Sequence, residues 1–389
     1  MYDLLIKNAY IADGSGKAGY VGNLAVEGDT IVAVGEVDGP AHREIDGTGL
    51  VLAPGFIDPH THYDAQFAWD SLLTSSPSHG VTTVVTGNCG VGMAPVRPDM
   101  REYLLEDLVN VEAIPYEDLK AGVEWSWTTF PEYMDAMQTA GLGINVAPLV
   151  ALTPIRHFVM GEESVKRAAN AVEIEGMKTV LKEAMDAGAF GFSTSILGPH
   201  VGYDGLPLAS RNASDDEYRA LCGVLKELDR GSIETTLNVT REIDEEQAGF
   251  IELLVNESGR PVTWLGTFNN PGEPGSYARK IRRLDHITAW DKAVPQSTGH
   301  PISFQFQLRR PTTLGIFPCF EQLLSLDNEA ITVLFNDPDY RQRVRDQVGG
   351  SEAFGKNFCG RMTVIDGNKP AVQPYIKSRQ NIAEMAEYR

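Results

Sequence analysis

Two patterns of hydrophobic and polar positions divide the chain near residue 50. Residues 1–50 contain short strand-like runs separated by glycine-rich turns, of which Gly28-Asp29 is the clearest. Such runs joined by tight turns predict a small β unit. After residue 50, short apolar runs alternate with longer segments of helical periodicity, which is typical of parallel βαβ units. We therefore expect a small β portion followed by a larger α/β portion.

Seven short apolar or β-branched runs predict the strands of the larger portion. They are Leu50–Ile57, Thr82–Thr86, Ile144–Leu149, Ala189–Ser193, Ile233–Val239, Pro261–Leu265 and Ile302–Gln307. Seven such strands are one fewer than a (β/α)8 barrel contains. The sequence thus predicts an α/β fold of the (β/α)8, TIM-like type with only seven recognisable strands. We expect the β unit over 1–50, the barrel over 51–350, and a C-terminal segment over 351–389 whose packing the pattern does not define.

Helix signals lie between these runs. Ser214 and Glu217 have the spacing of a capping box, and apolar residues on one helical face follow them. A second helix is expected through 177–185 and ends before Gly188, because glycine is common just past a helix C-terminus. A third is expected over 245–256, before Gly259.

Composition narrows the class of protein. Hydrophobic residues make up 42% of the 389 positions, which is enough for a sizeable core. The formal net charge of −20 argues against a nucleic-acid or anionic-membrane partner, since both require a basic surface. The four cysteines form no CxxC pair. The N-terminus lacks the features of a secretory signal. We expect a cytoplasmic protein with reduced thiols.

The pair His60-x-His62 is the most informative chemical feature. It follows the apolar run that ends at Ile57, which we interpret as a buried strand. Alternation along a strand places His60 and His62 on the same side, where two imidazoles form half of a divalent metal site. The alternative is two histidines in a solvated loop. Asp64 fits either an orienting partner for an imidazole or an ordinary turn aspartate.

A second candidate is Cys89, in the glycine-rich segment that follows the run ending at Thr86. The end of a barrel strand is where active sites of this architecture lie. A thiolate there is a good zinc ligand. The alternative is a small buried apolar residue, which describes most free cysteines.

Further polar residues follow other predicted strands. Ser193 ends the fourth run, and His200 and Arg211 follow it. His200 and Arg211 are candidates to hold a substrate carboxylate, for which the planar guanidinium is well suited. His157 follows the third predicted strand and is a candidate to line the mouth of the predicted barrel. A surface loop with ordinary polar groups remains the alternative. Serine-hydrolase, nucleotide-binding and dinucleotide-binding motifs are absent from the sequence.

Several of these motifs together resemble a known family. They are Gly55-Phe56-Ile57-Asp58-Pro59-His60-Thr61-His62-Tyr63-Asp64-Ala65-Gln66, His79-Gly80-Val81-Thr82-Thr83, Gly87-Asn88-Cys89-Gly90, Trp125-Ser126-Trp127-Thr128-Thr129 and Gly191-Phe192-Ser193-Thr194. This pattern resembles the amidohydrolase superfamily, and within it the N-acyl-D-amino-acid deacylase (D-aminoacylase) branch.

The resemblance implies a small β-sandwich attached to a metal-dependent barrel. His60 and His62 match the first-strand metal ligands, and Cys89 matches the cysteine that this branch uses as a ligand. It further implies a cofactor of one or two divalent ions, most naturally Zn²⁺, and hydrolysis of the amide bond of a small N-acyl amino acid. The ion would polarise the carbonyl and activate water.

The chain departs from the family pattern in three places. The runs Ser232–Thr240 and Arg260–Gly266 lack the histidines that the family has on its fifth and sixth strands. The segment with the general-base aspartate has no equivalent before Arg389, so the sequence assigns no catalytic base. We expect a member lacking the C-terminal third, completed by another chain or by self-association into a homo-oligomer. The alternatives are a catalytically impaired or non-catalytic homologue and a cyclic amide hydrolase on the same scaffold.

Overall fold

The structure is a computed structural model that describes residues 1–112, 114–237, 243–267, 275–286, 292–298 and 317–349. The chain forms two compact units. The first comprises residues 1–61, 70–85 and 141–147, and the second comprises 62–69, 86–140 and 148–389. Two sheets run through the described residues, one of five strands and one of seven.

The five-stranded sheet contains the N-terminal residues, as the sequence predicts. Its strands are β1 (Tyr2–Ile11), β2 (Tyr20–Glu27), β3 (Thr30–Gly35), β4 (Ala41–Asp46) and β5 (Val51–Leu52). Strands β2 and β3 are antiparallel and meet at the predicted Gly28-Asp29 turn, where Gly28 takes a φ of 60°. Leu5 and Ala25 are completely buried in a small core that also contains Val37.

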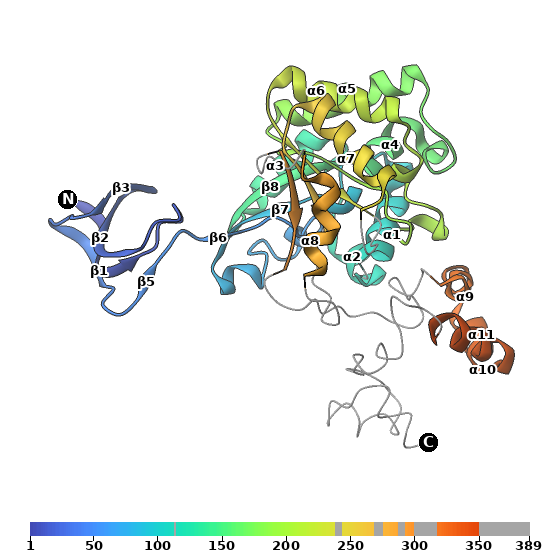
Figure 1. The fold of residues 1–389 in the computed structure, drawn as a ribbon, viewed down its shortest axis with the longest axis horizontal. Helices are drawn as coiled ribbons and strands as arrows, with labels where there is room; N and C mark the ends of the chain where they lie inside the picture. Colours follow the sequence, from blue (N-terminus) through green and yellow to red (C-terminus); the bar gives the residue numbers. More distant parts are fainter. Residues whose placement is uncertain (113, 238–242, 268–274, 287–291, 299–316, 350–389) are drawn as a thin grey trace. The chain divides into compact units, whose positions relative to one another are not determined.

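The seven-stranded sheet has the order β12-β11-β10-β9-β8-β7-β6. Its strands are β6 (Phe56–Asp58), β7 (Val81–Thr86), β8 (Asn145–Ala151), β9 (Gly191–Ser195), β10 (Ser232–Thr236), β11 (Val262–Leu265) and β12 (Ala293–Gln296). The pairings of β6 with β7 and of β8 through β12 in turn are parallel. Consecutive strands are thus neighbours, which is the order of a (β/α)8 barrel opened at one seam (Figure 1).

Helices connect the strands and pack beside one another along the chain. They are α1 (Arg101–Glu112), α2 (Tyr116–Gly122), α3 (Phe130–Ala140), α4 (Leu152–Met160), α5 (Ala171–Asp186), α6 (Asp215–Leu228), α7 (Glu245–Ser258) and α8 (Ser276–Ile281). Helix α5 packs against both α4 and α6, and α6 packs against α7. The predicted capping box of Ser214 and Glu217 starts α6, and Gly259 ends α7 in the left-handed conformation. None of the described helices is long and apolar enough to cross a membrane.

The predicted strand Leu50–Ile57 is wrong as a single buried strand. Val51 and Leu52 pair with β1 in the first sheet, whereas β6 begins at Phe56. Pro54 lies between the two strands and has no amide hydrogen for a ladder. Phe56 is 68% exposed and Ile57 is 67% exposed, so the side chains of β6 are not buried as the apolar run predicts.

The seventh strand of the sheet, β12, is not among the predicted strands. Strand β12 covers Ala293–Gln296, whereas the predicted run Ile302–Gln307 lies outside the described residues. The pattern did not reveal β12 because this strand has four residues and contains Pro295. The other five predicted strands are confirmed, and their ends differ from the prediction by at most three residues.

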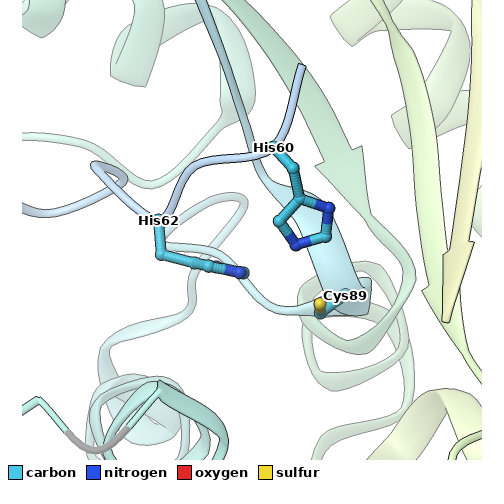
Figure 2. A group of neighbouring side chains, drawn as sticks. All are labelled: His60, His62 and Cys89. Atoms are coloured by element: carbon cyan, nitrogen blue, oxygen red, sulfur yellow. The ribbon is translucent and has the colours of Figure 1, made fainter. Parts of the chain in front are cut away.

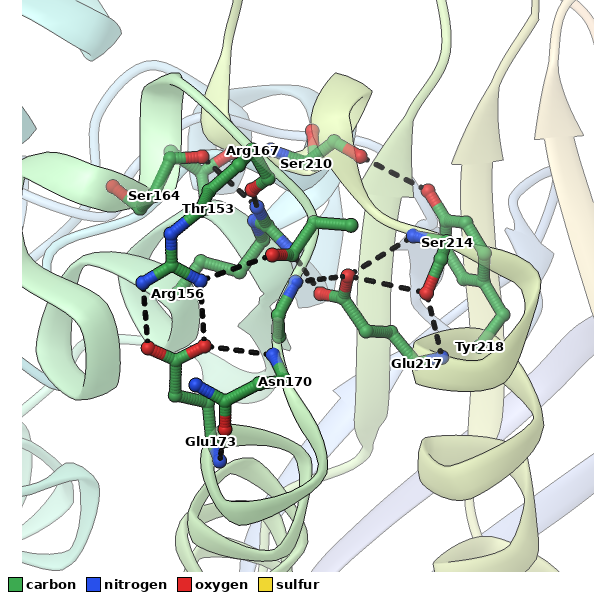
Figure 3. Close-up of polar contacts among 12 residues, drawn as sticks. Thr153, Arg156, Ser164, Arg167, Asn170, Glu173, Ser210, Ser214, Glu217 and Tyr218 are labelled. Atoms are coloured by element: carbon green, nitrogen blue, oxygen red, sulfur yellow. Dashed lines mark hydrogen bonds and ion pairs between the residues drawn. The ribbon is translucent and has the colours of Figure 1, made fainter.

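A buried ion pair ties the segments that follow β8 and β9 (Figure 3). Arg156 on α4 pairs with Glu217 at the start of α6, and both side chains are completely buried. Arg156 also donates from Nη2 to the carbonyls of Ser164 (2.9 Å) and Arg167 (2.6 Å). One guanidinium therefore joins α4 to the start of α6 and to the backbone at residues 164 and 167.

The last described segment is a small helical group of α9 (Pro318–Glu321), α10 (Asn328–Asn336) and α11 (Pro338–Gly349). Phe317, Phe320, Leu323 and Tyr340 form part of its apolar cluster. The predicted C-terminal segment 351–389 lies outside the described residues.

Candidate metal centre

His60 and His62 lie just after strand β6 rather than on it, because β6 ends at Asp58. Thr61, between them, fixes this extension. Its amide donates to the carbonyl of Val85 at 3.0 Å, and its hydroxyl donates to the same oxygen at 2.7 Å. The backbone therefore stays attached to the end of β7, and the two imidazoles keep the shared side that strand alternation predicts.

Cys89 lies in a tight 3-10 turn directly after β7, at the carboxyl end of the strand. The turn needs left-handed backbone at Gly87 (φ 76°) and at Cys89 itself (φ 57°). A Cβ on Gly87 would come within 2.2 Å of the Leu149 carbonyl oxygen, so only glycine fits there. The chain thus turns back sharply and directs the Cys89 side chain inward, where it is 2% exposed.

The three predicted ligands converge. One ligand atom each of His60, His62 and Cys89 lies within 4.8 Å of the other two. In Figure 2 the two imidazole rings and the sulfur point toward a common region. This is the geometric condition for a shared ion, and two imidazoles with one thiolate form a donor set that suits zinc. The assignment as ligands remains a prediction.

Three carboxyl groups lie near this cluster, two of them buried and that of Glu112 partly buried. Glu112, at the end of α1, lies 3.1 Å from His62 Nε2. Asp64 is 2% exposed, and its Oδ2 has no hydrogen-bond partner among the described residues. Glu234 on β10 is 1% exposed and accepts the amide hydrogen of Cys89 at 2.8 Å.

Burial disfavours the charged forms of these groups. It raises the pKa of Asp64 to about 7, and it raises the pKa values of Glu112 and Glu234 to about 8. Burial, followed by the nearby Glu234 and Glu112, raises the pKa of Cys89 well above its ordinary value. Four acidic groups so close together are unfavourable as anions unless a cation lies among them.

A divalent ion fits this environment. Its charge would favour the ionised carboxylates and the thiolate, reversing the effect of burial. If a neutral His62 donates Nε2–H to Glu112, its lone pair is on Nδ1, which would then be the nitrogen that coordinates an ion. The donor chemistry, the close acids and the unpartnered Asp64 oxygen all agree with a cation at this place.

Two of the residues predicted to bind substrate, His200 and Arg211, lie in the segment after β9. His200 Nδ1 lies 2.9 Å from Ser195 Oγ, and the His200 carbonyl accepts from Arg211 Nη1 at 3.2 Å. The Arg211 side chain is half-buried and forms no ion pair within the part of the chain that the structure describes. A role in binding a carboxylate remains a prediction for both residues.

Ser193 and His157 have partners inside the protein. Ser193 is completely buried, and its hydroxyl contacts the Gly87 carbonyl and accepts from the Gly90 amide at 3.2 Å. His157 is also completely buried, with Nε2 3.0 Å from Asp107 and Nδ1 2.7 Å from Ser164. Their burial argues against direct contact with a substrate.

Sequence reasoning missed Glu112, Glu234 and Thr236 as neighbours of the cluster. A signal existed for Glu234, because it is the one charged residue in the β-branched run Ser232–Thr236. An acid inside a buried strand is rare unless it has a partner. No comparable signal marks Glu112, which ends an ordinary helix.

Comparison with known proteins is consistent with this geometry. A family model described as the amidohydrolase family matches residues 43–330. D-aminoacylase of Alcaligenes xylosoxydans xylosoxydans is 38% identical over 199 residues, which cover 51% of this chain and 38% of that protein. The matched residues thus span well under half the length of this relative.

Two solved structures are similar. One is a D-aminoacylase described as having a binuclear metal centre, with 28% identity and a TM-score of 0.60 over 76% of this chain and 58% of that one. The other is N-acyl-D-glutamate deacylase from Bordetella bronchiseptica in complex with zinc and a phosphonate inhibitor. It has 27% identity and a TM-score of 0.58 over 75% of this chain and 57% of that one.

Proposed function

The chain belongs to the amidohydrolase family, and we propose that it hydrolyses the amide bond of a small N-acyl amino acid at a divalent metal ion. The observation that supports this most directly is the convergence of His60, His62 and Cys89 on one point at the carboxyl end of parallel strands. We propose Zn²⁺, because two imidazoles and a thiolate are typical zinc donors.

The ion, when bound, would supply Lewis-acid polarisation of the substrate carbonyl and activation of water. Other residues of this chain hold the three proposed ligands in place and favour a cation among them. Thr61 anchors the segment that contains both histidines, and the left-handed turn at Cys89 brings the sulfur to them. Glu112 orients His62, while Asp64 and Glu234 add negative potential that favours a cation.

We propose His200 and Arg211 as the groups that hold the substrate carboxylate. Arg211 is half-buried without a described ion-pair partner, and burial lowers its pKa, so an incoming carboxylate would compensate its charge. The names of the similar enzymes favour an N-acyl-D-amino acid over the L form. A cytoplasmic location and self-association remain predictions from the sequence.

The test is release of free amino acid from N-acetyl-D-amino acids by the zinc-loaded chain, with the L enantiomers as matched substrates. We expect turnover of the D substrates that EDTA abolishes and Zn²⁺ restores. His62→Ala and Cys89→Ala should lose it while keeping the circular dichroism of the parent protein. A folded, metal-loaded chain without activity on any D substrate, or alanine variants as active as the parent, would contradict the proposal.

A further inference from the structure

Strand β10 contacts the Cys89 turn through two side chains of the same face. Glu234 and Thr236 are two residues apart on the strand, so both point toward the turn. The Glu234 carboxylate accepts the Cys89 amide hydrogen at 2.8 Å, and the Thr236 hydroxyl lies 3.2 Å from the Cys89 sulfur. Both side chains on β10 are buried.

The Thr236 hydroxyl has a single hydrogen and two close acceptors. Cys89 Sγ lies 3.2 Å from Oγ1, and Glu234 Oε1 lies 3.4 Å from it. A hydroxyl donates to the better-placed acceptor, and a thiolate is a much stronger acceptor than a thiol. The hydroxyl is therefore placed to donate to the sulfur whenever Cys89 coordinates an ion as a thiolate.

Further contacts hold the backbone of the turn in place beside β9. Ser193 contacts the turn on both sides, at the Gly87 carbonyl and the Gly90 amide. A Cβ on Gly90 would lie 2.9 Å from the Ser195 amide nitrogen, so the turn also packs directly on β9. The backbone that carries the Cys89 sulfur is thus held by contacts with both β9 and β10.

We propose that Thr236 is a positioning residue of the metal centre, whose hydroxyl donates to the Cys89 sulfur and sets how strongly that sulfur binds the ion. Glu234 supports it by fixing the Cys89 backbone. The inference rests on the proposed metal site and deepens it, since it assigns control of the ligand strength to a strand that supplies none of the three ligands. Residues that orient a ligand in this way contribute about 10–100-fold to metal affinity.

The chain offers a matched control on the same strand. Thr235 is also completely buried, but its hydroxyl has no hydrogen-bond partner among the described residues. Thr235→Val and Thr236→Val remove the same atom from adjacent buried positions. Only the second removes a contact with sulfur, so a general effect of the substitution on folding would appear in both variants.

The experiment is a Co²⁺ titration of the full chain, followed by the sulfur-to-cobalt charge-transfer absorption and by competition with a chelator. Thr236→Val should bind Co²⁺ about tenfold or more weakly than the parent, within the range expected for an orienting partner. Its charge-transfer band should move to longer wavelength, because a thiolate without its hydrogen bond is easier to oxidise. Thr236→Ser keeps the hydroxyl, so its Co²⁺ affinity and the position of its charge-transfer band should match those of the parent. Thr235→Val should also match the parent in both.

The outcomes separate this inference from the proposed function. If the parent shows the band but Thr236→Val and Thr235→Val both match it, the role of Thr236 is refuted and the metal site stands. If both valine variants lose affinity equally, the effect is structural and the role is again refuted. If the parent shows no sulfur-to-cobalt band, or Cys89→Ser keeps it, the metal site fails and the inference fails with it.

Discussion

The substitution Arg156→Met tests how much the buried ion pair between α4 and α6 stabilises the fold. It removes the guanidinium from α4 and leaves the Glu217 carboxylate completely buried. The Ser164 and Arg167 carbonyls also lose their donor, although Glu217 Oε1 still accepts the amide hydrogens of Ala169 at 2.9 Å and Ser214 at 3.0 Å. Removing one partner of a buried pair costs about 3–5 kcal/mol, because the other charge stays desolvated.

The free energy of unfolding should therefore fall by about 3–5 kcal/mol, measured by urea unfolding followed by far-ultraviolet circular dichroism. This corresponds to a decrease in Tm of about 4–6 °C for a protein of this size, because the entropy of unfolding grows with chain length. The matched control is Arg219→Met. Arg219 pairs with Glu257 on the surface, where the side chains are 49% and 37% exposed, so the loss should stay below about 1 kcal/mol.

A second variant separates two causes of the lost stability: a buried carboxylate without its partner, and lost packing contacts. Arg156→Met combined with Glu217→Gln removes the charge but keeps an oxygen for the Ala169 and Ser214 amides. It should recover a large part of the lost stability, since neutral groups are cheaper to bury. If Arg156→Met costs no more than Arg219→Met, or the double variant is no more stable than the single one, the reasoning is refuted.

Two further predictions concern the backbone and pH. Gly191→Ala should destabilise the protein by several kcal/mol in urea unfolding, because its Cβ would lie 1.8 Å from the Ser232 carbonyl oxygen. Gly223→Ala on α6, where a Cβ meets nothing within 4 Å, should instead stabilise by about 0.5–1 kcal/mol, and equal effects of the two would contradict this account. Arg167 lowers the pKa of Glu173 from 4.5 to about 2, so the stabilisation by Glu173 is complete above pH 4.5 and disappears as the pH falls toward 2. The stability difference between the parent and Glu173→Gln should thus shrink between pH 7 and pH 3, and a difference that grew on acidification would be inconsistent with the ion pair.

The positions that local patterns specify were predictable from the sequence. Cys89 follows a β-branched strand, and parallel strands deliver such residues to one edge of the sheet. The Ser214 capping box likewise depends only on neighbouring residues. His60 and His62 were placed correctly on one side, although the strand itself is shorter, because Thr61 continues its backbone pairing with Val85.

The features that depend on long-range packing were not predictable in this way. Glu112 and Glu234 approach the histidines and the cysteine from a helix and a strand that are remote in the sequence. Strand β12 exists because β11 provides a parallel partner, and its own residues give a weak signal. The exposure of Phe56 and Ile57 depends on which strands flank β6, and the apolar run Leu50–Ile57 does not contain that information.

Metal content tests the central claim most directly. The parent chain, dialysed against Zn²⁺ and then against metal-free buffer, should retain roughly one equivalent or more by elemental analysis, as expected for a site with two imidazoles and a thiolate. Cys89→Ala and His62→Ala, treated in parallel and still folded, should retain far less. Retention of the same amount by the parent and both variants, or of almost no metal by the parent, would contradict a shared ion at His60, His62 and Cys89.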